Sequence, residues 1–273
     1  MHSEPAIEKH QVDEVRNLQR ELQALAPQVT ARMTTSIRCN LAPDDLKSFP
    51  EGCKLVHFVR HGEGHHNVVQ REWRGRPTWD GLSEPYTLDN DPSFKFLDPE
   101  LTTRGREQAE ALQARAALLS VDLLVCSTLR RATQTGLIAF ANCMANRPLS
   151  VIASDLCHEI GGKHTCDKRS AVSQLRLEFP SVDYSLVKEE EDPLWLDGMT
   201  RESLASLSHR AARFAEWLGQ RPEKQIAVAS HSAFLLAIFN AVFTTDKEQT
   251  CSWFGTGEMR TVLLSFAPFQ EST

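Results

Sequence analysis

The 273-residue sequence has no long hydrophobic run. Its longest uninterrupted apolar stretch, residues 233–239, is far too short to cross a bilayer. The chain opens with polar and charged residues and lacks the apolar segment of a secretory signal. We therefore expect a cytoplasmic protein without a membrane partner.

The sequence also lacks an excess of positive charge. Its 30 lysines and arginines are outnumbered by 36 aspartates and glutamates, which gives a formal net charge of −6. Such a chain has no general attraction for nucleic acid, and we expect no nucleic-acid partner. Any anion that it binds must be held by a local site.

Closely paired cysteines, which would suggest a disulfide framework, are absent as well. An odd set of seven is scattered along a chain that is too long to need disulfides for stability. Scattered cysteines of this kind favour a protein that resides in a reducing compartment. The cysteines are Cys39, Cys53, Cys126, Cys143, Cys157, Cys166 and Cys251.

The composition is that of a globular protein, with 41% hydrophobic and 24% charged residues. Short β-rich runs alternate with helical patterns, which predicts a three-layer α/β/α sandwich with a mostly parallel central sheet. Strands are expected at 54–59, 121–126, 149–153, 225–229 and 260–266, and helices at 103–119, 131–144, 169–179, 202–219 and 233–243.

A helical extension is predicted to precede this domain. Residues 5–25 place Val15, Leu18, Leu22 and Leu25 on one face, and Pro27 is expected to end the helix. Residues 28–52 have little periodicity and are interpreted as a linker or an extension along the domain surface. The chain is thereby divided into an extension at 1–52 and a main domain at 53–273. The apolar face either packs on the domain or forms a homodimer as a short coiled coil.

Two further segments, residues 70–100 and 181–200, are long and irregular. Connections of this length are often functional, and we expect residues 70–100 and 161–200 to form walls facing a substrate. Trp73, Trp79 and Phe94 either line that pocket or pack within their own loop. The acidic run at 188–192 is interpreted as a solvated surface.

The polar residues of greatest interest follow the predicted strands. Arg60 and His61 follow the first strand, Arg131 follows the second, Glu159 the third, and His231 the fourth. Because open α/β sheets bind ligands at the carboxyl ends of their strands, we expect these side chains to share one site.

The set suits phosphoryl transfer. A neutral imidazole can attack phosphorus and hold the phosphoryl group covalently. Arginine forks match phosphoryl oxygens, and a carboxylic acid can protonate the departing alkoxide. One histidine as nucleophile and the other as a phosphate ligand is the simplest assignment.

The motifs resemble those of the histidine phosphatase superfamily, the phosphoglycerate-mutase-like fold, over roughly residues 54–266. They occur in the family order and end with a serine and histidine before a helix. The matching residues are Arg60-His61-Gly62-Glu63 with Asn67, Ser127-x-Leu129-x-Arg131-Ala132-x-Gln134-Thr135, Glu159, and Ser230-His231.

The resemblance implies a phosphate-monoester hydrolase in which His61 becomes phosphohistidine. It implies that Arg60, Arg131, His231 and, less directly, Asn67 bind the phosphate. Glu159 would be the general acid and later the base that activates water. No metal and no cofactor are implied, and the partner would be a small phosphorylated substrate or a phosphoprotein.

Departures from the family pattern bear on the activity. Ser232 stands where many members have glycine, and the segments typical of cofactor-dependent phosphoglycerate mutases are missing. Cys166-Asp167-Lys168-Arg169 after the acid favours the phosphatase branch. The alternatives are a phosphoglycerate-type phosphomutase and a catalytically weak phosphate-binding interaction module.

Several single residues have competing interpretations. Arg130 is expected to be a surface neighbour of Arg131. Asp155 and Glu63 could replace Glu159 as the acid, although Glu63 better suits fixing the turn. His57 is expected to be packed inside its strand. His65 and His66 are expected to be exposed, the alternative being that they add positive charge at the mouth of the pocket when protonated. Zinc is disfavoured by the spacing of its candidate ligands, Cys157, His158, His164 and Cys166.

Overall fold

The computed structural model describes residues 4–44, 46 and 48–268. Its centre is a sheet with the strand order β1-β6-β2-β5-β3-β4. The neighbouring pairs β2–β5, β5–β3 and β3–β4 are parallel, whereas β6 is antiparallel to both β2 and β1. The predicted α/β fold with a mostly parallel sheet is therefore confirmed. The strands are β1 (Thr35–Leu41), β2 (Cys53–Arg60), β3 (Leu123–Ser127), β4 (Ser150–Ser154), β5 (Gln225–Ser230) and β6 (Met259–Pro268).

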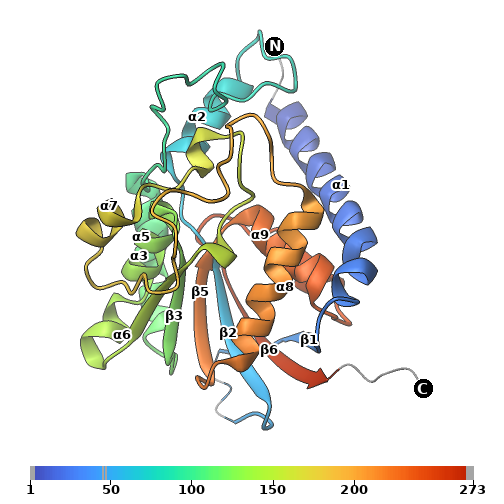
Figure 1. The fold of residues 1–273 in the computed structure, drawn as a ribbon, viewed down its shortest axis with the longest axis vertical. Helices are drawn as coiled ribbons and strands as arrows, with labels where there is room; N and C mark the ends of the chain where they lie inside the picture. Colours follow the sequence, from blue (N-terminus) through green and yellow to red (C-terminus); the bar gives the residue numbers. More distant parts are fainter. Residues whose placement is uncertain (1–3, 45, 47, 269–273) are drawn as a thin grey trace.

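Helices cover both faces of the sheet (Figure 1). Helices α1, α8 and α9 lie on one side, and α3, α5, α6 and α7 lie on the other. The helices are α1 (Glu4–Thr30), α2 (His65–Arg74), α3 (Thr103–Ala111), α4 (Gln113–Ala116), α5 (Arg130–Ala139), α6 (Ala141–Asn146), α7 (Val172–Glu178), α8 (Leu204–Gln220) and α9 (Ser232–Ala237), which runs into a π-helical turn, η3 (Ile238–Val242). Within the described residues, none of the helices is both long and apolar enough to cross a bilayer.

The sheet has a hydrophobic core on each face because its central strands alternate between them. In β3, Leu123 and Val125 join the core beneath α8 and α9, whereas Leu124 and Cys126 join the core on the opposite face. Successive side chains of a strand point to opposite faces, so an all-apolar strand is buried on both. The two cores fix the strand ends that carry the site.

The predicted linker at 28–52 is wrong for Thr35–Leu41, which forms the edge strand β1 and pairs with β6. Ile37 and Cys39 are buried while Arg38 between them is exposed. This alternation is the strand pattern, but it is short and set among threonine, serine and asparagine, so it is weak in the sequence. Pro27 also does not end α1, which continues to Thr30.

The apolar face of α1 packs on its own chain, the first of the two alternatives. Leu22 is fully buried in the core on that face, and Leu18 and Leu25 pack against it. The contacts of α1 are mainly with α8 and η3. Residues 1–3 of the predicted extension lie outside the described residues.

Two predicted helices need correction, and one helix was not predicted. The helices expected at 103–119 and 131–144 are each broken in two, at Leu112 and Phe140. Helix α2 was not predicted, because its ten residues, HHNVVQREWR, are mostly polar and present only a narrow apolar stripe. Its first residues belong to the motif that follows β2, so the motif enters a helix rather than a loop.

Candidate active site

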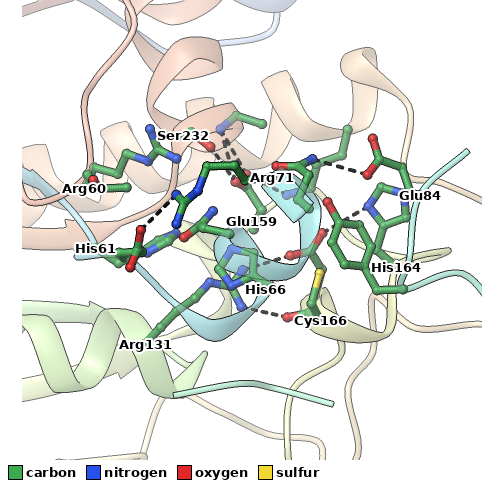
Figure 2. A pocket seen from close by; sticks show the side chains of 18 of the residues that line it. Arg60, His61, His66, Arg71, Glu84, Arg131, Glu159, His164, Cys166 and Ser232 are labelled. Carbon is green, nitrogen blue, oxygen red and sulfur yellow. Dashed lines mark hydrogen bonds and ion pairs between the residues drawn. The ribbon is translucent and has the colours of Figure 1, made fainter. Parts of the chain in front are cut away.

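The carboxyl ends of β2, β3 and β5 open into a pocket of about 680 Å³ (Figure 2). Four of the predicted site residues, Arg60, His61, Arg131 and Glu159, line it together with Asn67. His231 is fully buried and is not among the lining residues, but its ring lies 5.1 Å from that of His61, centroid to centroid. The structure therefore brings all six predicted residues into one region.

The His61 side chain is held in one orientation. Its Nδ1 donates a hydrogen bond to the carbonyl oxygen of Gly62 at 2.6 Å. Because a neutral imidazole carries one proton, this bond leaves the lone pair on Nε2. His61 is thus arranged as a neutral ring with Nε2 as the basic and nucleophilic atom.

Burial and neighbouring charge keep His61 neutral. Its pKa lies well below the ordinary value of 6.5, first because the ring is buried, and then because Arg131, His66 and Arg60 oppose a further positive charge. The hydrogen bond to the Gly62 backbone raises the pKa, but by less than burial and the neighbouring charges lower it. The imidazole is therefore in its nucleophilic form at neutral and mildly acidic pH.

Close backbone packing fixes the turn after His61. A Cβ on Gly62 would lie 2.3 Å from the carbonyl oxygen of Gly105, and a Cβ on Gly105 would lie 2.0 Å from that of Glu63. The N–H of Gly62 also donates to Thr135 Oγ1 of α5. Two glycines are needed here because the start of α3 presses directly against the loop.

Arg60 and Arg131 lie on either side of the His61 ring (Figure 2). Arg60 donates to the carbonyl oxygen of Phe254 at 2.7 Å, and burial lowers its pKa to about 10, so it stays charged at neutral pH. Arg131 donates to the carbonyl oxygen of Cys166 and pairs with Asp167 at 2.8 Å. Each guanidinium is thereby fixed in place.

Asp167 anchors two arginines of the pocket. One carboxylate oxygen pairs with Arg131 and the other with Arg201, at 2.9 Å. Although burial opposes ionisation, these charges hold the pKa of Asp167 well below its usual range. The sequence signal for Asp167 was the Cys-Asp-Lys-Arg segment. It was interpreted as a feature of the phosphatase branch of the family and not as part of the site.

Glu159 lies at the entrance to α9. Its carboxylate accepts hydrogen bonds from the backbone N–H groups of Ile160, Ala233 and Phe234 and from the hydroxyl of Ser232. Ser232 thus makes a bond at 3.2 Å that the glycine common in the family could not make. These donors aim the carboxylate beside the pocket, which it lines.

Asn67 and His66 belong to the first turn of α2. The Asn67 side chain accepts a hydrogen bond from the N–H of Gly64 and so caps the helix. The expectation that His66 is exposed is wrong, since it is buried, lines the pocket and lies 5.5 Å from the His61 ring. His65 is exposed as expected. Helical geometry turns adjacent residues to different sides, which the loop interpretation missed.

His231 packs behind His61. Its Nε2 shares a hydrogen bond of 2.7 Å with Ser127 Oγ at the end of β3. Its Nδ1 is buried without a hydrogen-bond partner among the described residues, as are Nε of Arg60 and Nε of Arg131. Burial lowers the pKa of His231 well below 6.5, with Arg131 and His61 adding to the effect.

The rival acids lie elsewhere or have other partners. Asp155 is outside the pocket and contacts Thr128 and Arg169. Glu63 lines the pocket but pairs with Arg71 and accepts a hydrogen bond from Thr102, which suits a role in fixing the turn.

Other sequence candidates lie away from the pocket. Arg130 pairs with Glu100 and Glu178 outside it. His57 is packed inside β2 and contacts Thr261. Among the described residues, no group of three or more histidine, cysteine, aspartate or glutamate side chains is arranged to hold a metal ion.

Both predicted walls contribute to the pocket. Residues 70–100 supply Gln70, Arg71, Arg74, Glu84 and Tyr86, and residues 161–200 supply His164, Cys166 and Asp167. Trp73, Trp79 and Phe94 do not line the pocket; they contact Arg76, Arg74 and Trp195, respectively. Trp73 and Trp79 thus pack within their own segment, the second of the two interpretations, whereas Phe94 packs against the other irregular segment. The lining residues that lie outside the predicted site and walls are Glu14, Val15, Leu18, Arg104, Ile160, Arg201, Leu204, Ala233, Trp253 and Thr256.

Comparison with known proteins defines the family. The model of the histidine phosphatase superfamily (branch 1) matches residues 94–265, which is more than half of the chain. The chain therefore belongs to the histidine phosphatase superfamily. The matched segment includes Arg131, Glu159 and His231, whereas α1, β1 and β2 precede it.

Its relatives include phosphatases and mutase-like proteins. A "Phosphoglycerate mutase-like protein" of Arabidopsis thaliana is 32% identical over 217 residues, covering 69% of this chain and 74% of that protein. "Phosphoserine phosphatase 1" of Hydrogenobacter thermophilus is 31% identical over 195 residues, covering 71% and 77%. "Phosphoglycerate mutase-like protein 1" of Arabidopsis thaliana is 29% identical over 244 residues, covering 78% and 81%. Phosphatase or mutase chemistry is thus the general class of activity.

Proposed function

We propose that this protein hydrolyses phosphate monoesters through a phosphohistidine intermediate on His61. The observation that carries the proposal is the neutral His61 ring, with Nδ1 bonded to the Gly62 carbonyl and Arg60 and Arg131 beside it. Nε of Arg60, Nε of Arg131 and Nδ1 of His231 are buried without a hydrogen-bond partner among the described residues, and the oxygens of a phosphoryl group bound beside His61 would satisfy them.

In the first step, Nε2 of His61 attacks phosphorus and the bond to the alcohol oxygen breaks. The proton stays on Nδ1, and its hydrogen bond to the Gly62 carbonyl oxygen stabilises the positive charge that the ring acquires. Arg60 and Arg131 stabilise the charge on the transferring phosphoryl oxygens. His231 acts as a further phosphate ligand.

Glu159 donates a proton to the departing alcohol oxygen. In the second step its carboxylate removes a proton from water, and the water oxygen attacks the phosphorus of phosphohistidine. The bond between phosphorus and Nε2 of His61 breaks, and inorganic phosphate is released. The position of Glu159 on the pocket wall supports both roles. No step of this reaction requires a metal ion, so a chelator should leave the activity unchanged.

The nucleophile can be tested by trapping the intermediate. The wild-type protein, mixed with a ³²P-labelled phosphomonoester and quenched in alkali, should carry label that acid removes, as expected for phosphohistidine. His61→Ala should carry no label and lose essentially all hydrolysis, whereas His65→Ala on the exposed neighbouring histidine is the matched control. Labelling of His61→Ala at the wild-type level would refute the assignment.

The mutase alternative has one observation in its favour, the mutase-like names of the Arabidopsis relatives. An isomerase assay with a phosphoglycerate, with and without a bisphosphate primer, separates the two activities. Hydrolysis that exceeds isomerisation under both conditions supports the phosphatase. The reverse ratio would make the protein a mutase that uses the same His61 chemistry.

A further inference from the structure

One side of the pocket is apolar, and the N-terminal helix builds part of it. Leu18, Ile160, Leu204, Ala233 and Trp253 line the pocket and also pack against the core on the α8 and α9 face. Val15 of α1 completes this apolar wall. The wall is therefore supported from behind by the core and does not depend on a loop for its shape.

The apolar wall begins at the proposed acid. Ile160 follows Glu159 in the chain, and the N–H of Ala233 donates to the Glu159 carboxylate. An acid must reach the oxygen of the leaving alcohol, so that oxygen lies beside Glu159. Carbon atoms of the alcohol that extend from this point past Ile160 and Ala233 would contact the apolar wall.

The charged side chains that line the rest of the pocket are largely paired already. Arg71 pairs with Glu63, Arg74 with Glu84 and Glu14, and Arg201 with Asp167. A second anionic group on the substrate would have to compete with these carboxylates. Besides Arg60, which is assigned to the phosphate, Arg104 is the lining arginine that forms no such pair among the described residues, and it is exposed.

We infer that the substrate is a phosphate monoester of an alcohol with an apolar body, and that Val15 and Leu18 of α1 select for it. This inference rests on the proposed function, because Glu159 sets the direction in which the alcohol extends. The segment matched by the family begins at residue 94, so α1 is a part of this chain that the family match does not cover.

The inference can be tested by binding alone, with non-hydrolysable alkylphosphonates measured by calorimetry. Ethyl-, butyl- and hexylphosphonate share a head group and differ only in apolar length. A fully buried methylene strengthens binding about fourfold, and a wall on one side should give about half of that free energy, or about twofold per methylene. Hexylphosphonate should therefore bind at least about tenfold more tightly than ethylphosphonate.

Variants on α1 localise the effect. Val15→Asn and Leu18→Asn should reduce the ratio of hexyl to ethyl affinity by about threefold or more. Val12→Asn is the matched control, since Val12 is on the same helix, is 48% exposed and does not line the pocket. Thermal unfolding of each variant checks that the helix still packs, and Val15→Asn keeps the test valid if Leu18→Asn unfolds.

A phosphonate of the same length that ends in a carboxylate tests the opposite possibility. If it binds more tightly than hexylphosphonate, the substrate carries a second anion and the inference is wrong. An affinity that does not change with alkyl length also overturns it. These outcomes are independent of the proposed function, which fails separately if no His61-dependent phosphoenzyme forms while the alkyl series behaves as expected.

Discussion

At the scale of single residues, the site depends on side chains whose protonation and orientation are fixed by neighbours. His61 is neutral because it is buried among cations, and its reactive nitrogen is defined by one backbone hydrogen bond. Glu159 is aimed by three backbone donors and the Ser232 hydroxyl. The Ser232 bond shows that this departure from the family pattern adds a contact to the proposed acid.

Replacing Glu159 with glutamine should impair substrates according to their leaving groups. For alkyl phosphates, whose oxygen departs poorly without a proton, kcat/KM should fall about 100-fold or more. For nitrophenyl phosphate, whose oxygen leaves readily, the decrease should be much smaller. Asp155→Asn is the control, because that carboxylate lies outside the pocket. Equal losses on both substrates would point to a different acid.

At the scale of elements, the site depends on how closely helices approach the strand ends. Helix α3 begins against the loop after β2, where Gly105 contacts the backbone of Glu63. Helix α5 places Arg131 in the pocket and, through Thr135, holds the N–H of Gly62. The nucleophile is thus positioned by helices far from it in the sequence.

Gly105→Ala should therefore destabilise the protein despite the better helix propensity of alanine. Its Cβ would lie 2.0 Å from a backbone oxygen, so the loop or the helix must move, at a cost of about 1–3 kcal/mol. Activity should fall as the turn carrying His61 shifts. Gly255→Ala is the matched control, since its Cβ would meet nothing closer than 3.7 Å. Chemical denaturation and hydrolysis assays of both variants measure the difference; a Gly105→Ala protein as stable as the control would contradict this account.

At the scale of the whole molecule, a chain of net charge −6 builds a local pocket lined by six arginines and five carboxylates. It also buries several histidines whose protonated forms the fold disfavours. Burial lowers the pKa of His57 to about 4 and that of His164 to about 3, and it lowers the pKa values of His61, His66 and His231 well below 6.5.

Stability should consequently fall as the pH falls below about 6.5. In that range the unfolded chain takes up protons on these histidines and the folded protein does not, so the free energy of unfolding decreases. His57 alone contributes about 1.4 kcal/mol per pH unit until the pH approaches its folded pKa of about 4. In urea unfolding between pH 5.5 and 4.5, His57→Gln should show a slope smaller by about that amount. Equal slopes for the variant and the wild type would show that His57 is protonated in the fold.

Much of the fold and of the site's composition was predictable from the sequence. The strands β2, β3, β4, β5 and β6 are recognisable because buried apolar runs end at turn residues, and the chemistry is recognisable because the polar residues follow these runs directly. Strand β1 and helix α2 were missed, since their apolar residues are few and the contacts that stabilise them come from distant segments.

The sequence by itself determined the α/β class, that any bound anion must be held by a local site, and which residues follow the carboxyl ends of the strands. Only the tertiary structure decided the protonation and partners of those residues, and the walls around them. Asp167 could not be seen to anchor Arg131 and Arg201, nor α1 to supply Val15 and Leu18 to the pocket. The physical reason is that burial and pairing depend on what folding places side by side, which periodicity along one segment does not encode.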